Sequence, residues 1–198
     1  MNFLAHLYLS GDQPAMRVGG FVADFVKGSI LNTLPHKVQQ GVRLHRQIDS
    51  FTDLHPNVQQ TVILLKPSLG RYAGVAADIL FDHFLAKNFQ YYTTYSLPEF
   101  VTETHLQLTD YLAYFPPRAQ VVWSYCTSQN WLLNYAHWIG IERSFHGMTK
   151  RTGQTKFIES LAFIPSLLPE IQHNFEAFWP GLVAFSEHSC AKLLSSDA

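Results

Sequence analysis

The segment YAGVAADILFDHFLAK, residues 72–87, decides the predicted fold. It is the most apolar stretch of the chain, and apart from its end residues its only polar side chains are Asp78, Asp82 and His83. A charge buried without a partner is strongly destabilising. The sequence therefore predicts a central helix whose polar side chains either bind a divalent cation or form a solvated flank beside a hydrogen-bonded histidine.

Helical patterns extend on both sides of this segment. Apolar residues over 18–26 fall on one helix face, and a later apolar stripe contains His45 and Asp49. Residues 96–99 (SLPE) form a capping box that opens a further helix. The predicted helices are 14–28, a helix starting at 35–37, 58–65, 72–87, 97 to the break at 116–117, 157–164, and 170–190 with a kink at Pro180.

The whole chain is expected to form one helical domain. Apart from the ambiguous start FLAHLYL, residues 3–9, no alternating apolar and polar run bounded by hairpin turns is present. With 198 residues, of which 47% are hydrophobic, the chain can bury one sizeable core. We expect an all-α, single-domain helical bundle over residues 1–198.

Composition narrows the function classes. The 14 basic and 15 acidic residues give no global field that would recruit nucleic acid or an anionic membrane. The two cysteines, Cys126 and Cys190, are isolated, which argues against a disulfide framework and a thiolate zinc site. No window reaches the roughly 18 uninterrupted apolar residues of a membrane span. The expected protein is soluble and cytoplasmic.

The motif HRQID, residues 45–49, offers a second group of possible ligands. His45 and Asp49 stand one turn apart on the buried stripe. They could be two ligands of one ion, a ligand with an orienting carboxylate behind it, or a structural hydrogen-bonded pair. Two such helices in one small domain favour a shared cation, because each needs a buried partner.

Two further residues have open readings. Asp24 falls off the apolar stripe of its helix among small residues, so it is either a surface aspartate or a site member approached by another helix. His6 lies inside the apolar start NFLAHLYL and is either a core histidine or part of the site.

Basic residues suggest where an anion could bind. Arg43 and Arg46 flank His45, and guanidinium groups suit phosphate oxygens. The interval 143–157 carries four basic residues and no acid, so it is either a docking site for an acidic partner or a solvated loop.

Several catalytic motifs are missing from the chain. It contains no P-loop, dinucleotide glycine fingerprint, GxSxG or HExxH. Phosphoester hydrolysis by metal-activated water needs none of these, only an open cation site, a cationic clamp and a proton donor for the leaving group.

Five ordered blocks resemble the bacterial acyl carrier protein phosphodiesterases, also called acyl carrier protein hydrolases. The resemblance runs from Met1 to about Trp179. The blocks are MNFLAHLYLS (1–10), GGFVADFVKG (19–28), GVRLHRQIDSFTD (41–53), DILFDHFLAKN (78–88) and SQNWLLNY (128–135).

That family is similar to the HD-type metal phosphohydrolases, all-helical enzymes whose ligands follow the order histidine, His-Asp pair, distant aspartate. Here the order is Asp24, His45 and then Asp82-His83. The pair is inverted and the lone aspartate comes first, which is what a permuted HD-type fold would give.

The resemblance implies hydrolysis of the phosphodiester that joins 4′-phosphopantetheine to a serine of holo acyl carrier protein. The products are the apo carrier and 4′-phosphopantetheine. The carrier is an acidic protein, and the implied cofactor is Mn²⁺ (or Mg²⁺). His6 or His83 would protonate the leaving serine. The implied roles are metal ligands Asp24, His45, Asp82 and His83; catalytic residues Asp24, His6, Asp49 and Asp78; and substrate-binding residues Arg43, Arg46 and Lys27.

Two other readings stay open. One is an HD-type hydrolase that acts on a nucleotide or another small phosphodiester. The other is a non-enzymatic helical binding module whose buried histidines and aspartates are structural. Stoichiometric Mn²⁺ in the purified protein would argue against the second.

Overall fold

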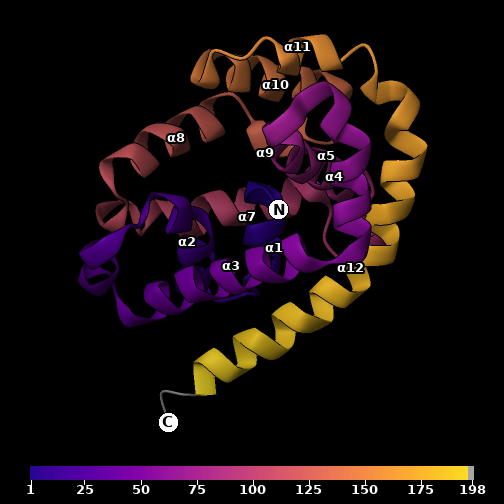
Figure 1. Ribbon diagram of the computed structural model, residues 1–198. Helices are drawn as coiled ribbons and strands as arrows, with labels where there is room; N and C mark the ends of the chain where they lie inside the picture. The colour runs from indigo at the N-terminus through magenta and orange to yellow at the C-terminus, as the bar shows by residue number, and fades with distance from the viewer. Residues whose placement is uncertain (196–198) are drawn as a thin grey trace.

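Helices dominate the structure. The computed structural model describes residues 1–195, and over that range it forms helices and no strand (Figure 1). The prediction of an all-α protein is confirmed. The last three residues of the predicted domain, 196–198, lie outside the described residues, and the single-domain assignment itself stays a prediction.

The elements follow one another with short connections. They are α1 (Phe3–Leu9), α2 (Pro14–Val22), the 3₁₀ turns η1 (Ala23–Phe25) and η2 (Gly28–Thr33), α3 (His36–Leu54), α4 (Pro56–Leu69), η3 (Gly70–Tyr72), α5 (Ala73–Lys87), α6 (Phe89–Tyr92), α7 (Leu97–Thr109), η4 (Leu112–Tyr114), α8 (Pro117–Ser128), α9 (Trp131–Asn134), α10 (Trp138–Thr152), α11 (Lys156–Ser160) and α12 (Ile164–Ser195).

The predicted central helix is α5. Its apolar side chains are almost entirely buried, and Phe81 and Phe84 pack against Phe175 of α12 at ring-centroid distances of 5.5 and 6.0 Å. Full burial of one such side chain stabilises the fold by about 1.5–3 kcal/mol. The apolarity of α5 thus reflects burial by neighbouring helices.

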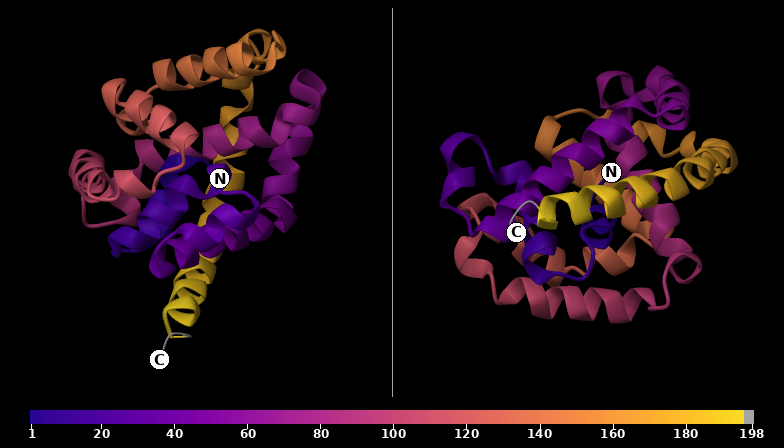
Figure 2. Two further views of the ribbon diagram at one scale, coloured as in Figure 1. Left: turned by 90° about the vertical axis from the view of Figure 1, so that its left-hand side faces the viewer. Right: turned by 90° about the horizontal axis from the view of Figure 1, so that it is seen from below.

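Helix α12 holds several elements together. It packs against α1, α3, α4 and α5, and Figure 1 shows it leaving α11 and changing direction on its way to the C-terminal end. The view from below shows its last turns crossing the molecule (Figure 2). The predicted helix 170–190 is therefore too short, since α12 continues through both Pro169 and Pro180.

The crossing of α2 and α3 is unusually close. A Cβ atom added to Gly19 would overlap the backbone of Val38 and Gly41, and one added to Gly41 would overlap the backbone of Met16 and Gly19. Because only glycine permits this approach, the end of α2 and the following turn η1 lie directly beside α3. This crossing brings together segments that later form the candidate site.

Other predicted helix ends are also wrong, including that of 157–164, which ends at Ser160. The helix predicted over 14–28 ends at Val22, and the chain tightens into η1 before Val26 becomes extended. Helix α4 continues past Pro67 to Leu69, because a proline in the last turn removes a single hydrogen bond. Helix α7 ends at Thr109, well before the predicted break. Its predicted capping box is confirmed.

Candidate metal centre

Three side chains from two helices form a compact cluster. Helix α1 supplies His6, and α3 supplies His45 and Asp49, with the ligand atoms of all three within 4.8 Å of one another. The Nε2 atoms of His6 and His45 lie 3.1 and 3.2 Å from the two carboxylate oxygens of Asp49. The imidazole rings stack, with centroids 3.6 Å apart. Asp49 therefore bridges both histidines.

The backbone of α2 fixes the orientation of His45. Its Nδ1–H donates a hydrogen bond of 2.8 Å to the carbonyl oxygen of Gly20, inside the closely packed α2–α3 crossing. This bond leaves Nε2 as the atom that faces the cluster. An imidazole held by one nitrogen and free to bind through the other is typical of metal-ligating histidines.

Asp24 adds a second carboxylate beside His45. The early end of α2 turns the chain through η1, so that Oδ1 of Asp24 lies 3.5 Å from Nε2 of His45. Its side chain is 64% exposed, in contrast to that of His45. Asp24 thus stands at the open edge of the cluster, where it can reach an ion or a substrate.

The carboxylates of the cluster favour a positive charge on His45. Burial disfavours the charged form of His45, but hydrogen bonds to Asp24 and Asp49 outweigh this effect and raise its pKa to about 9. Burial and the neighbouring charge of His45 lower the pKa of His6 to about 3. For Asp49, burial is outweighed by its contacts with His45 and His6, so its pKa lies below the usual range. The carboxylates thus hold a positive charge at this position.

The donor set fits a divalent cation. Both nitrogens of the buried His6 lack a well-aligned hydrogen bond within residues 1–195, and such orphaned groups are uncommon in native proteins. A cation between His6, His45 and Asp49 would satisfy one of these nitrogens and replace the proton of His45. Imidazole and carboxylate ligands without thiolate suit Mn²⁺ and tolerate Mg²⁺.

Asp82 is not one of the three grouped residues and has other partners. Its carboxylate is fully buried and accepts backbone hydrogen bonds from Leu4 (2.7 Å), Asn2 (3.2 Å) and Ala5 (3.3 Å). Burial raises its pKa to about 7, although these bonds favour the charged form. Asn2 does not cap α1 with its own side chain. Asp82 therefore caps the N-terminus of α1. The sequence predicted it as a metal ligand, but it is not part of the group of His6, His45 and Asp49.

His83 and Asp78 also have other partners. His83 is buried, and its Nδ1–H donates to the carbonyl oxygen of Tyr135 at 2.7 Å. Asp78, predicted as a catalytic residue, forms a 2.8 Å ion pair with the amino group of Met1. Neither belongs to the His6, His45 and Asp49 group. Both instead hold neighbouring segments against α5.

The three predicted substrate-binding residues lie beside the cluster or on the chain that leads to it. Arg43 and Arg46 are exposed on α3, and Nη2 of Arg46 donates to the carbonyl oxygen of Val26 at 3.0 Å. Lys27 follows Val26 directly and is exposed. Arg46 thereby ties the chain after Asp24 to α3, one residue after His45.

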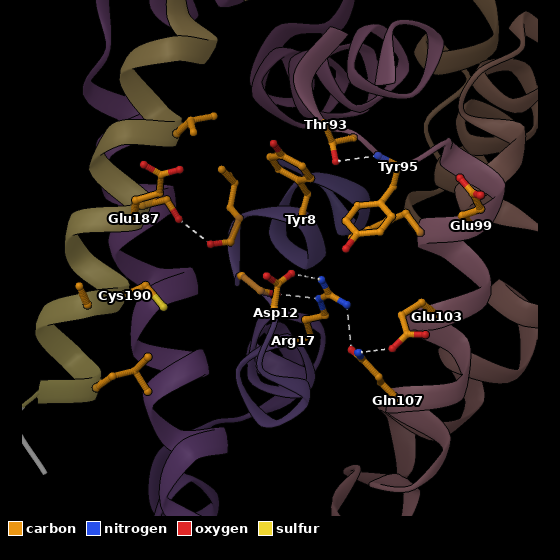
Figure 3. Close-up of a pocket in the computed structure, with 17 residues that line it drawn as sticks. Tyr8, Asp12, Arg17, Thr93, Tyr95, Glu99, Glu103, Gln107, Glu187 and Cys190 are labelled. Atoms are coloured by element: carbon orange, nitrogen blue, oxygen red, sulfur yellow. Dashed lines mark hydrogen bonds and ion pairs between the residues drawn. The ribbon is translucent and has the colours of Figure 1, made fainter. Parts of the chain in front are cut away.

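A cavity of about 1030 Å³ lies on another part of the surface (Figure 3). It is bounded by α7, α12 and the α1–α2 connection, and its lining includes none of the cluster residues. The guanidinium of Arg17 in its wall already donates to Gly11, Asp12 and Gln107. The remaining charged lining residues, Glu99, Glu103 and Glu187, are acidic. This balance disfavours a phosphodiester there, so the cavity does not compete with the cluster as the reaction site.

Two features of the site could not be decided from the sequence. They are the place of His6 in the cluster and the backbone partners of Asp82. A lone histidine in an apolar helix does not reveal which helix it faces, and the stacking with His45 depends on packing between α1 and α3. One signal for Asp82 was available. The first turn of α1 lacks a good side-chain cap, so its backbone N–H groups needed an acceptor from another part of the chain.

Comparison with known proteins identifies a single family. A family described as "Acyl carrier protein phosphodiesterase" matches residues 1–182. Three of the relatives with the same name illustrate the similarity. The protein from Photorhabdus laumondii is 38% identical over 152 residues, covering 76% of this chain and 77% of the relative. The Enterobacter sp. (strain 638) protein is 32% identical over 185 residues (92% and 96%), and the Yersinia pestis protein 30% over 190 residues (95% and 98%).

No solved structure matches the chain, so its expected relation to a permuted HD-type fold stays a prediction. The family match covers the cluster and the elements that position it. The chain belongs to the acyl carrier protein phosphodiesterase family.

Proposed function

We propose that this protein hydrolyses the phosphodiester between 4′-phosphopantetheine and a serine of holo acyl carrier protein, in a reaction that depends on a divalent cation. Water adds to phosphorus, the bond between phosphorus and the serine oxygen breaks, and the serine regains a proton. Family membership and the names of the relatives support the reaction.

The observation that carries the cation dependence is the cluster of His6, His45 and Asp49, with Asp24 at its edge. These residues would hold Mn²⁺, or Mg²⁺. When bound, the cation supplies a Lewis acid for the phosphate oxygens and lowers the pKa of water.

The side chains around the cluster have separable tasks. The Gly20 carbonyl keeps Nε2 of His45 turned toward the cluster, and Asp49 holds both imidazoles. Asp24, exposed beside the cation position, is suited to accept a proton from attacking water. Arg46 and Arg43 would neutralise phosphate oxygens from the exposed side of α3.

The predicted proton donors for the leaving serine need revision. Burial lowers the pKa of His83, and burial together with the charge of His45 lowers that of His6. Both imidazoles are therefore neutral near pH 7 in the metal-free protein. His83 also already uses Nδ1–H for Tyr135. In this proposal His83 has no role in the reaction, and His6, predicted as a catalytic residue, becomes a cation ligand.

The substrate is a protein, and the site lies on an accessible part of the surface, as the half-exposed carboxylates of Asp24 and Asp49 indicate. No helix among residues 1–195 is both long and apolar enough to cross a membrane. A cytoplasmic location and the lack of nucleic acid binding stay predictions.

The test is direct. Purified protein is incubated with holo acyl carrier protein and Mn²⁺, and the carrier is weighed by mass spectrometry. We expect a loss equal to the 4′-phosphopantetheine group, abolished by a chelator and restored by added Mn²⁺. A carrier that keeps its mass, while a nucleotide phosphodiester is cleaved under the same conditions, would overturn the proposed substrate.

A further inference from the structure

We propose that one basic face, formed by Lys27, Ile30, Lys37, Arg43 and Arg46, is the docking surface for the acidic carrier protein. This inference rests on the proposed function. All five side chains are exposed, and they come from the α2–α3 connection and the exposed side of α3.

Charge supports this choice of partner. From residue 25 to residue 48 the chain contains four lysines or arginines and no aspartate or glutamate, although acidic residues slightly outnumber basic ones overall. The basic segment on α10 and α11 is less uniform, because Glu142 and Glu159 border it. A surface of one sign attracts and orients a partner of the opposite sign.

The turn η2 is built as a surface element. It contains no buried residue and exposes Ile30 at 41%, while Val26 and Leu34 on either side of it are buried and anchor its ends. Its side chains therefore contribute little to the core. A short exposed turn with an apolar side chain between basic residues suits an acidic helix that also presents apolar residues.

The chemistry of the substrate fixes how near the docking surface must be. The bond that breaks joins phosphorus to the serine oxygen, so it lies at the carrier's own surface and not at the end of the flexible 4′-phosphopantetheine arm. The carrier must therefore sit against the cluster itself. The basic face satisfies this requirement. Its Arg46 follows His45 directly on α3 and donates a hydrogen bond to Val26, which lies two residues after Asp24. Asp24 in turn contacts His45 of the cluster.

The competing basic segment lies farther from the cluster. Helices α10 and α11 pack on each other and against α5 and α4, respectively. Figure 1 and the left view of Figure 2 place them along the edge of the molecule opposite α3. A carrier docked there would hold its serine away from His45, so this segment does not meet the distance requirement.

Two matched double variants test the inference. Ile30→Glu/Lys37→Glu changes an exposed isoleucine and an exposed lysine of the basic face, and Ile158→Glu/Lys156→Glu makes the same replacements on α11. Binding of fluorescently labelled apo and holo carrier is measured by anisotropy, and turnover of holo carrier is measured with Mn²⁺. Thermal melts confirm that both variants fold.

We expect Ile30→Glu/Lys37→Glu to raise the carrier Kd and KM by about tenfold or more and to flatten their dependence on salt. Its kcat should stay within about threefold of wild type, because rim charges act mainly on encounter. The α11 variant should bind and turn over like wild type.

Wild-type affinity in the Ile30→Glu/Lys37→Glu variant would overturn the inference, as would an equal loss in the α11 variant. The binding assay needs no turnover. Carrier that binds through the basic face yet keeps its 4′-phosphopantetheine would therefore refute the proposed function and leave the docking surface standing.

Discussion

Replacing Asp49 by asparagine removes one charge and keeps the shape of the side chain. In the native protein the two carboxylate oxygens face Nε2 of His6 and of His45 at 3.1 and 3.2 Å. The amide of Asp49→Asn can accept from one imidazole only, and its NH₂ group then faces the other. The variant therefore tests whether Asp49 is a ligand or a structural partner.

The expected effects of Asp49→Asn on unfolding free energy and on Mn²⁺ affinity can both be worked out. The rise in the pKa of the buried His45 from 6.5 to about 9 corresponds to roughly 3 kcal/mol, shared between Asp24 and Asp49. Because Asp24 remains, we expect the metal-free variant to lose about 1–2 kcal/mol of unfolding free energy at pH 7. As a direct ligand, Asp49 should also contribute at least the roughly 100-fold in Mn²⁺ affinity that marks the upper range for supporting groups.

The assay pairs thermal melts, with and without Mn²⁺, with calorimetric titration of Mn²⁺ and turnover of holo carrier. Asp53→Asn is the matched control, since Asp53 lies one turn further along α3 and is exposed. It should leave Mn²⁺ affinity unchanged. If Asp49→Asn melts lower but keeps its Mn²⁺-induced shift and near-normal turnover, Asp49 is structural and Asp24 must carry the site.

Three further predictions concern packing, capping and pH. Gly41→Ala should cost about 1–3 kcal/mol by overpacking the α2–α3 crossing and should weaken Mn²⁺ binding, measured by urea unfolding and calorimetry. Asp82→Asn should cost about 2 kcal/mol by weakening the acceptor of three backbone N–H groups, with Mn²⁺ affinity within about threefold of wild type; an unchanged melting temperature would contradict this role. In metal-free protein, the raised pKa of His45, about 9, gives stability that is full below pH 6.5 and lost as pH rises through 9, whereas the lowered pKa of His6, about 3, gives stability that is full above pH 6.5 and lost as pH falls toward 3. Above about pH 6.5 the melting temperature should therefore fall, and His45→Gln should abolish this alkaline decline. On the acid side, the raised pKa of Asp82, about 7, opposes the effect of His6, so the alkaline side is the test.

Local features were predictable from the sequence. The buried helix at residues 73–87 and the capping box at Ser96 both depend on side chains that are close together in the chain. Both predictions are confirmed. The i, i+4 pair His45 and Asp49 also follows from helix geometry alone, and its two side chains do share one cluster.

Features that depend on distant contacts were not predictable. An aspartate in an apolar helix looks the same whether it binds a cation or caps another helix, so only the position of α1 reveals the role of Asp82. Likewise, α12 continues through Pro180 because packing against four other helices compensates for the local cost of the proline.

The glycine contact between α2 and α3 also limits how this protein can be engineered. Alanine in place of a helical glycine commonly stabilises a protein by about 0.4–1 kcal/mol. Gly147 is an exposed residue of α10 with open space for the added methyl group, so it is a sound target for thermostabilisation. Gly19 and Gly41 are not, because their missing side chains set the spacing that holds Gly20 and Asp24 against His45. A library that replaces helical glycines indiscriminately would therefore combine a stabilising change at Gly147 with changes at Gly19 and Gly41 that disrupt the candidate metal centre.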